Sequence, residues 1–303
     1  MKFTDGYVKQ VALLVNIFSV ISTDDDFALK GGSAINLFYQ DLPRLSVDID
    51  LAYLPLTPRK ESIEKINKSL ACIQESLLAN GFQSVLVGPD DARKVFCSDG
   101  VATVKIEPNY TIRGSVLPVK SITVSKKVQK TFGIAKMQVL DLDELYAGKI
   151  CAALDRQHPR DLFDIWQMYE SGVGLTDRMI QCLVVYLLSH GRPTHELLDC
   201  SIKDNLDLFE GEFAGMTECT VDYATLQNAL QKLKADLLQR LLPYCDALVS
   251  FVELNPDFTA LPFDNLDALP ALKWKRMNLE KLRASNPAKF KHQAEILKQL
   301  FYR

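Results

Sequence analysis

The stretch FALKGGSAINLFY (residues 27–39), followed after a short loop by VDIDLAY (residues 47–53), decides the fold of this chain. The first stretch has an apolar start, a Gly-Gly-Ser turn and a helix-forming run. It predicts a strand, a turn and a helix with Ser33 as its cap. In the second stretch apolar and acidic residues alternate, which is the two-residue period of a strand. Asp48 and Asp50 are therefore expected to point to the same side.

The two aspartates suggest a metal site. Their Cα atoms would lie roughly 6–7 Å apart, because a strand rises about 3.3 Å per residue. Two carboxylates that close repel each other unless a cation lies between them. Hard oxygen ligands suit Mg²⁺, which proteins hold with one or two carboxylates and the phosphates of a substrate. By itself, an Asp-x-Asp pair is more often an ordinary solvated strand edge.

The glycine turn strengthens the case for a phosphate ligand. Gly31 and Gly32 allow the backbone to approach a phosphate closely, and the first amides of the following helix attract an anion. Ser33 adds a hydroxyl donor. A plain turn into a helix is the commoner use of Gly-Gly, but here the turn precedes a strand with Asp48 and Asp50. Together they predict a phosphate cradle beside a metal site.

A third carboxylate would complete a two-metal site. Glu107 ends the β-rich segment Val104-Lys105-Ile106-Glu107 and has the required chemistry. It could equally be an ordinary surface glutamate, and the sequence leaves both readings open.

The rest of the first half mixes a helix with strands. Thr57-Pro58 starts a helix and Asn80-Gly81 ends it, which gives about six turns. The remaining segments rich in β-forming residues are broken by Gly, Pro and Asp, and they complete a small mixed sheet. These segments are residues 82–87, 101–107, 116–124 and 134–139.

From Asp141 onward, helical periodicity dominates. We expect helices over residues 141–154, 159–169, 176–189, 222–252 with a break at Pro243, and 287–302. The predicted fold class is therefore α+β. A small mixed-sheet lobe (residues 1–140) is followed by a mainly helical C-terminal lobe (residues 141–303).

Composition fits a folded, water-soluble protein. The seven cysteines are scattered, with no C-x-x-C pair, and are typical of core residues in a reducing compartment. The apolar run Val11 to Ile21 resembles a signal sequence, but Asn16 interrupts it and three aspartates follow. We expect an N-terminal helix, no membrane span and a cytoplasmic location.

The C-terminal stretch is locally basic although the net charge of the chain is −3. From Lys273 to Arg303 there are nine Lys or Arg residues and two Glu residues. Such a stretch can dock a polyanion such as RNA, or it can be a solvated face of terminal helices.

The motifs together resemble a known family. LKGGSA (residues 29–34), RLSVDIDL (residues 44–51), LYAGK (residues 145–149) and RDLFD (residues 160–164) are similar to the AbiEii/MenA nucleotidyltransferase toxins. These belong to the wider superfamily related to DNA polymerase β, whose pattern is Gly-Ser followed by a spaced Asp-x-Asp. The similar blocks cover about residues 28–165, and the interval from Ser33 to Asp48 is somewhat longer than usual.

The resemblance implies a toxin of a type IV toxin–antitoxin or phage-defence system. It implies a bilobal fold, Mg²⁺ as cofactor, a nucleoside triphosphate (NTP) as donor, an RNA acceptor, for some members tRNA, and a cognate antitoxin encoded nearby. The implied nucleotide-binding residues are Lys30, Gly31, Gly32, Ser33, Arg44 and Ser46. Asp48 and Asp50 are implied as catalytic metal ligands with Glu107 as a possible third, Lys149 and Asp161 as catalytic, and Arg156, Arg160 and Asp164 as supporting.

The later block can also be read physically. Lys149 lies on a predicted helix with an apolar stripe, and Arg156 follows on nearly the same side. Asp161 and Asp164 are one turn apart on the next helix, so one of them could orient Lys149 or Arg160. The alternative is an interhelical salt-bridge cluster without a catalytic role.

Three functions from different classes remain at this point. The first is an RNA nucleotidyltransferase acting on tRNA 3′ ends. The second is an enzyme of the same scaffold that modifies a protein or chiefly binds GTP. The third is a non-catalytic interaction protein, which the intact Asp48/Asp50 pair disfavours. No Walker A, G-x-S-x-G or H-E-x-x-H motif supports other enzyme classes, and His158 and His190 have no catalytic spacing.

Overall fold

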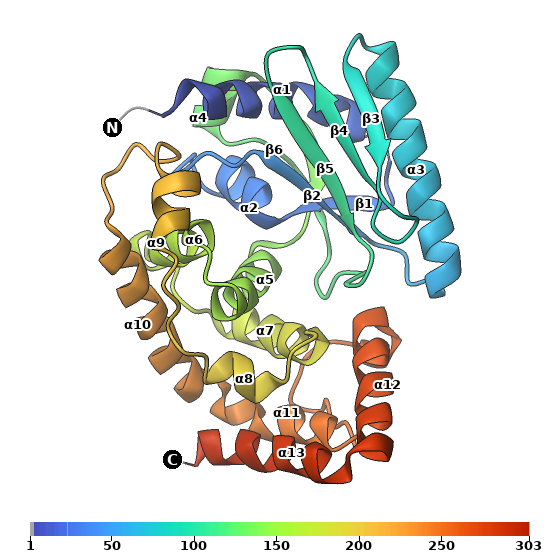
Figure 1. Cartoon of the computed structure of the whole chain (residues 1–303), viewed down its shortest axis with the longest axis vertical. Helices are drawn as coiled ribbons and strands as arrows, with labels where there is room; N and C mark the ends of the chain where they lie inside the picture. Colours follow the sequence, from blue (N-terminus) through green and yellow to red (C-terminus); the bar gives the residue numbers. More distant parts are fainter. Residues whose placement is uncertain (1–2, 23, 303) are drawn as a thin grey trace. The chain divides into compact units, whose positions relative to one another are not determined.

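The computed structural model describes residues 3–22 and 24–302 (Figure 1). The chain forms two compact units. The first comprises Met1–Leu145 and Phe213–Thr220, and the second comprises Tyr146–Glu212 and Val221–Arg303. The fold is α+β: all strands of the described residues lie in the first unit, and the regular elements described in the second unit are helices.

The first unit is built on a seven-stranded mixed sheet with the order β3-β4-β5-β2-β1-β7-β6. Pairs β2–β5 and β1–β7 are parallel and the others are antiparallel. The strands are β1 (Phe27–Lys30), β2 (Asp48–Tyr53), β3 (Gln83–Val87), β4 (Lys94–Ser98), β5 (Thr103–Asn109), β6 (Lys120–Thr123) and β7 (Lys136–Val139). The sheet places β2, the strand with the two aspartates, at its centre.

Helices α1 (Asp5–Ile21) and α3 (Arg59–Ala79) pack against each other and against the sheet. Ile49, Leu51 and Tyr53 of β2 are fully buried, whereas Asp48 and Asp50 on the alternate face are only partly buried. The expected alternation of β2 is therefore confirmed. The apolar side of the strand belongs to the core and the acidic side remains accessible.

The segment after β1 differs from the expectation in one respect. The helix starts at Gly31 as α2 (Gly31–Ala34) and continues as a wider π-helical turn, η1 (Ile35–Tyr39). Lys30 occupies the cap position, so the prediction that Ser33 caps this helix is wrong. Ser33 lies inside the helix because Gly31, with a φ of +73°, makes the turn two residues earlier.

The predicted first-half elements are otherwise confirmed. Helix α3 ends at Ala79, before Asn80 and Gly81, and the four predicted β-rich segments contain β3, β5, β6 and β7. Strand β4 and the short helix α4 (Lys126–Phe132) were not predicted.

The second unit contains α5 from Tyr146 onward and the helices that follow. Helices α5 (Leu142–Asp155), α6 (Pro159–Glu170), α7 (Asp177–Ser189) and α13 (Pro287–Phe301) match the predicted ranges closely. The break at Pro243 is confirmed, because a 3-10 turn at Leu242–Tyr244 separates α10 (Tyr223–Leu241) from α11 (Cys245–Val252). Elements without a predicted range are α8 (Thr194–Leu198), α9 (Leu206–Leu208), η2 (Phe209–Phe213), η4 (Leu266–Ala268) and α12 (Pro270–Ser285). Among the described residues, no helix combines the length and the apolar character needed to cross a bilayer.

Candidate functional site

Three neighbouring strands place charged side chains on one face of the sheet. Asp50 of β2 is in register with Lys30 of β1 on one side and with Glu107 of β5 on the other. Asp48, two residues earlier on the same face, is in register with Lys105 of β5. Parallel pairing of β2 with β5 therefore brings Glu107 beside the aspartates, although it is more than fifty residues away in sequence.

The glycine turn lies directly against one of the aspartates. A Cβ atom added to Gly31 would lie 2.6 Å from Asp50 Oδ2, so a side chain at this position would force the carboxylate to move. Gly31 also has a left-handed backbone, with a φ of +73°, that disfavours other residues. The phosphate-cradle candidate and the carboxylate pair thus share one location, as the sequence predicted.

A buried polar network supports this turn from below. A Cβ atom on Gly32 would lie 2.6 Å from a terminal guanidinium nitrogen of Arg44 and 2.9 Å from Ser46 Oγ. Arg44 is only 2% exposed and donates to the carbonyl oxygen of Leu45 at 2.9 Å. Arg44 and Ser46 therefore hold the turn from within the protein, and direct contact of either with a nucleotide stays a prediction.

Ser33 belongs to the same network. Its hydroxyl lies 3.1 Å from Ser46 Oγ, donates to the main-chain carbonyl oxygen of Asp48 and is 1% exposed. The hydroxyl thus ties the turn to the start of β2. The expected hydroxyl donor toward phosphate is directed into the protein here, so the turn offers its backbone amides instead.

A distant segment of the chain fastens this loop. Arg44 forms an isolated antiparallel bridge with Thr217, and the amide of Leu45 donates to the carbonyl oxygen of Met216 at 2.8 Å. The segment Phe213–Thr220 thereby belongs to the first unit. No sequence signal indicated that these residues return to the sheet unit.

The carboxylate pair suits Mg²⁺ by its donor chemistry. Asp48 and Asp50 supply two hard anionic ligands on one accessible face, and substrate phosphates ordinarily complete such a site. Glu107 is a weaker candidate for a metal ligand, because its carboxylate forms an ion pair with Lys105 Nζ at 2.6 Å. No group of three or more His, Cys, Asp or Glu side chains within residues 3–22 and 24–302 has metal-binding spacing. Glu107 as a third ligand stays a prediction.

Lys105 lies among these carboxylates. Its ammonium is 3.9 Å from Asp48 Oδ1 in addition to its contact with Glu107. Burial lowers the pKa of Lys105, but Glu107, Asp48 and Asp50 more than offset this and raise the pKa above its ordinary value. Lys105 was not among the predicted site residues, although its position two residues before Glu107 put it on the same face.

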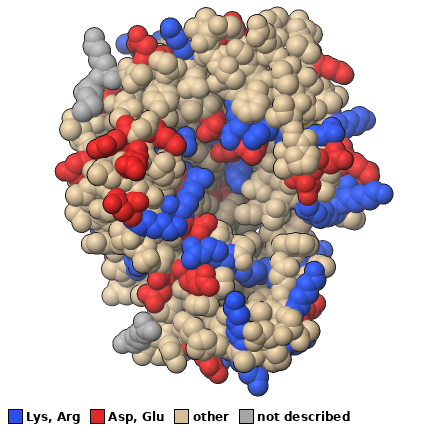
Figure 2. All heavy atoms as spheres, viewed as in Figure 1, with Lys and Arg blue, Asp and Glu red and all other residues tan. Residues whose placement is uncertain are grey.

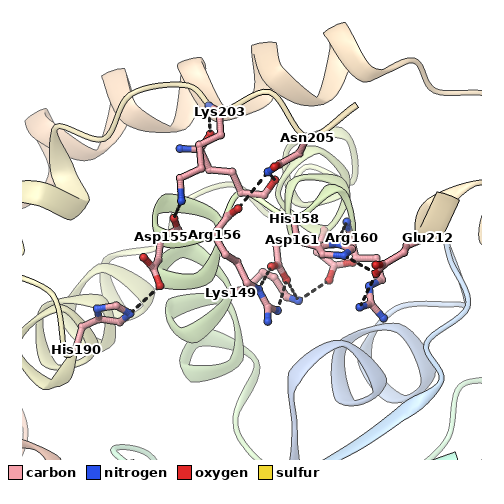
Figure 3. A network of polar contacts seen from close by, with 12 residues as sticks. Lys149, Asp155, Arg156, His158, Arg160, Asp161, His190, Lys203, Asn205 and Glu212 are labelled. Carbon is pink, nitrogen blue, oxygen red and sulfur yellow. Dashed lines mark hydrogen bonds and ion pairs between the residues drawn. The ribbon is translucent and has the colours of Figure 1, made fainter. Parts of the chain in front are cut away.

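The second unit holds a largely buried charge cluster of its own (Figure 3). Lys149 Nζ of α5 lies 2.7 Å from Asp161 Oδ1 and 2.9 Å from Asp164 Oδ2, both on α6. Arg156 Nε lies 2.6 Å from Asp161 Oδ2. Lys149 is 7% exposed and each aspartate 1%, whereas the Arg156 side chain is 64% exposed. The predicted proximity of Asp161 and Asp164 to Lys149 is confirmed, and their contacts connect α5 with α6.

The cluster stabilises the ionised form of Asp161. Burial raises the pKa of this carboxyl, but the charges of Lys149 and Arg156 and their hydrogen bonds outweigh it and hold the pKa well below its usual range. Asp161 is thus a fixed negative charge that positions Lys149. The geometry agrees with a salt-bridge cluster, and a catalytic role for Lys149 stays a prediction.

Arg160 contacts an acidic residue from another part of the second unit. Its guanidinium is 3.9 Å from Glu212 Oε2, and His158 Nε2 lies 3.1 Å from the same oxygen. His158 also caps α6 by accepting from the amide of Arg160, and burial lowers its pKa. Both side chains lie at the start of α6 and contact Glu212 there.

The basic C-terminal stretch needs one correction. Lys275 is buried, and its ammonium donates to the carbonyl oxygens of His190 and Arg192 at 2.8 Å and of Gly191 at 3.3 Å. Its ammonium holds the segment after α7 in place. The expectation that Lys275, as part of the basic stretch, could contact RNA is therefore wrong. The exposed face of α12 instead carries Lys273, Trp274 and Lys281.

Comparison with known proteins agrees with these features. A family model described as "Nucleotidyl transferase AbiEii toxin, Type IV TA system" matches residues 12–290. MenT4, a nucleotidyltransferase toxin of Mycobacterium tuberculosis H37Rv, is similar in structure with a TM-score of 0.56 and 12% identity. The likeness covers 96% of this chain and 93% of that one, and it shows a shared fold.

Weaker matches come from Helicobacter pylori. A protein whose nucleotidyltransferase assignment is itself provisional has a TM-score of 0.47 and 16% identity, over 78% of this chain and 98% of its own. JHP933 has a TM-score of 0.36 and 17% identity, over 99% of both chains. None of the curated protein sequences matches the chain.

Proposed function

The chain belongs to the AbiEii family of nucleotidyltransferase toxins of type IV toxin–antitoxin systems, and on that premise we propose that it transfers a nucleotide from an NTP to RNA. The acceptor proposed is the 3′ end of tRNA, in the cytoplasm, as part of toxin–antitoxin or phage-defence activity. Family membership implies a cognate antitoxin. The observation that carries the proposal is the packing of Gly31 against the Asp50 carboxylate, which joins a phosphate cradle to a metal-ligand pair.

Asp48 and Asp50 would hold Mg²⁺ through their carboxylates, beside the phosphates of the donor. When bound, Mg²⁺ would neutralise charge on the phosphates during transfer. Gly31 and Gly32 would admit the donor phosphates to the first backbone amides of α2, where the helix dipole favours an anion. The residues around the turn have a positioning task, because phosphoryl transfer depends chiefly on placement and charge neutralisation.

Lys149 and Asp161 are proposed as further contributors on the strength of the motif match. The contact of Lys149 with both Asp161 and Asp164 fixes the direction of its ammonium, which supports a role as a positioned cation. Arg156 shares the Asp161 carboxylate and would help to keep it ionised.

The exposed side of α12 supports RNA as the acceptor. Trp274 is 47% exposed, and Lys281 Nζ lies 5.9 Å from the centre of its ring. An exposed aromatic ring flanked by Lys273 and Lys281 suits an unstacked base and its neighbouring phosphates. Figure 2 shows Lys and Arg interspersed with Asp and Glu on the face of the molecule that it draws. Because the net charge of the chain is −3, RNA would bind through a local group of basic residues.

The experiment that tests the function is direct. Purified protein is incubated with Mg²⁺, each labelled NTP in turn, and total RNA or total protein as acceptor. We expect label to appear in RNA of tRNA size and to require Mg²⁺. Label in protein alone would favour the protein-modifying alternative, and no label with any NTP would contradict the proposal.

A further inference from the structure

Arg113 is a buried cation that has no ionic partner among the residues that the structure describes. It lies after β5, is 6% exposed, and its Nε is buried without a hydrogen-bond acceptor. Its one hydrogen bond joins Nη1 to the carbonyl oxygen of Thr57 at 3.3 Å, a long and neutral contact. Among the described residues no carboxylate forms an ion pair with it. A buried guanidinium in this state is costly unless an anion accompanies it.

The surroundings add positive charge. The Thr57 carbonyl precedes α3, a helix of 21 residues whose first turn contains Arg59, Lys60 and Glu61. No side chain caps this end of the helix, so its first amides and the positive end of its dipole face outward. Burial and the nearby charge of Arg59 lower the pKa of Arg113.

The acidic groups close by are engaged elsewhere. Arg59 pairs with Asp91 at 2.9 Å, with both side chains about half exposed. Glu61 pairs with Lys65 at 2.8 Å, one turn along the helix. The buried hydroxyl of Tyr53 makes no well-formed hydrogen bond with a described residue, and it lies near enough to Arg113 to influence the pKa of the guanidinium. The Arg113 guanidinium therefore lies beside the uncapped start of α3, and Arg59 in the first turn is near enough to lower the Arg113 pKa.

We propose that Arg113, Arg59 and the first-turn amides of α3 form an anion site that binds a phosphate group. Arginine side chains and helix N-termini are the donors that phosphates prefer, and an anion would offset the buried charge of Arg113, while Arg59 could share its contacts between Asp91 and the phosphate. The site is distinct from Asp48 and Asp50. The amide of Gly114 donates to the carbonyl oxygen of Tyr53 at 2.7 Å, which places the Arg113 loop at the far end of β2. Tyr53 is three residues beyond Asp50, or about 10 Å, and points to the opposite face.

Thermal melting in phosphate and in chloride, at equal pH and ionic strength, tests the proposal. At about ten times the Kd, phosphate should raise the melting temperature of the parental protein by roughly 2–5 °C. Arg113→Met should abolish this rise. In chloride it should melt at or above the parental temperature, because it removes an uncompensated buried charge.

Two further variants keep the result interpretable. Arg59→Gln changes an exposed residue and should weaken phosphate affinity several-fold even if Arg113→Met fails to fold. Arg240→Met removes an exposed arginine paired with Asp177 and should keep the full phosphate response. An equal phosphate response in the parental protein and in both Arg113→Met and Arg59→Gln, or no response beyond chloride in the parental protein, would overturn the proposal.

A short RNA oligonucleotide without terminal phosphates distinguishes the source of the phosphate. If it reproduces the Arg113-dependent rise, the ligand is a backbone phosphate of RNA. If only inorganic phosphate acts, the ligand is a free phosphate or a small phosphate ester. Both results support the phosphate site, and neither depends on nucleotide transfer.

Discussion

The ammonium of Lys149 lies 2.7 Å from the carboxylate of Asp161, and both side chains are buried. The contact joins α5 to α6, and Asp164 accepts the same ammonium from the next turn of α6. Lys149 therefore stabilises the packing of α5 on α6, whether or not it also contributes to catalysis. Its structural and catalytic contributions can be separated experimentally.

Lys149→Met should destabilise the protein strongly. Removal of the cation leaves Asp161 and Asp164 buried close together, and loss of one partner from a buried ion pair costs about 3–5 kcal/mol. Urea denaturation measures the change. Lys65→Met, which breaks the exposed pair with Glu61, is the matched control and should melt almost normally. A near-parental free energy of unfolding for Lys149→Met would contradict the buried-cluster description.

The rate of nucleotide transfer by the folded variant tests whether Lys149 also contributes to catalysis. If Lys149 acts on the donor, Lys149→Met should slow transfer by about a hundredfold or more under conditions where it is folded. Asp161→Asn should lower activity non-additively with it, since Asp161 positions the lysine. Parental transfer rates in both folded variants would leave the cluster a purely structural role.

Asp161 should make stability depend on pH in the acid range. Because its folded-state pKa lies below the ordinary value of about 3.9, its ionised form stabilises the fold above that pH, and the benefit is lost as pH falls below it. The difference in unfolding free energy between the parental protein and Asp161→Asn should be constant from about pH 5 to 8. It should shrink below about pH 4. A difference that grows toward acid would contradict the assignment.

Gly31→Ala should disturb the carboxylate pair directly. The new methyl group would lie 2.6 Å from Asp50 Oδ2, so the carboxylate must move. Gly81→Ala is the control, because Gly81 has a similar φ of +86° but open space where the methyl would lie. We expect both to lose some stability, about 1 kcal/mol from the left-handed backbone. Only Gly31→Ala should weaken Mn²⁺ or Mg²⁺ binding in calorimetry; equal binding in both variants would show that the turn does not position Asp50.

Much of the site follows from local sequence. The alternation in VDIDLAY fixed the common direction of Asp48 and Asp50, and the helical spacing of Asp161 and Asp164 brought both to Lys149. These relationships depend only on the period of a strand or helix.

What could not be predicted depends on contacts distant in sequence. Lys105 beside Asp48 follows from the parallel register of β2 and β5, which no local pattern specifies. The burial of Lys275 depends on carbonyl groups at the end of α7, more than eighty residues earlier. The Ser33 cap was wrong because the left-handed Gly31 starts the helix two residues early.

The outer face of α12 should contact RNA through Lys273, Trp274 and Lys281. Reversal of both lysines to Glu should flatten the salt dependence of binding by a slope of about 1.4, since each single-strand phosphate contact contributes about 0.7. Trp274→Ala should weaken binding by about 1–3 kcal/mol through lost stacking, with a smaller change in slope. Filter binding at several salt concentrations measures both.

Two variants control for this surface. Lys232→Glu reverses an exposed lysine on α10 and should leave the salt slope nearly unchanged. Lys275→Met should lower the melting temperature, because Lys275 holds three backbone carbonyls. An unchanged slope after reversal of Lys273 and Lys281 would assign these residues to a solvated face.

The central claim is that Asp48 and Asp50 carry metal-dependent nucleotide transfer. The most direct test measures transfer of labelled nucleotide from an NTP to RNA, with Mg²⁺, by Asp48→Asn and Asp50→Asn. Asp177→Asn, which changes an exposed carboxylate on α7, is the control. Each site variant should lose at least about a hundredfold in rate while keeping the parental melting temperature, because each removes one anionic ligand with little change in volume. Parental transfer rates in folded Asp48→Asn and Asp50→Asn would contradict the claim.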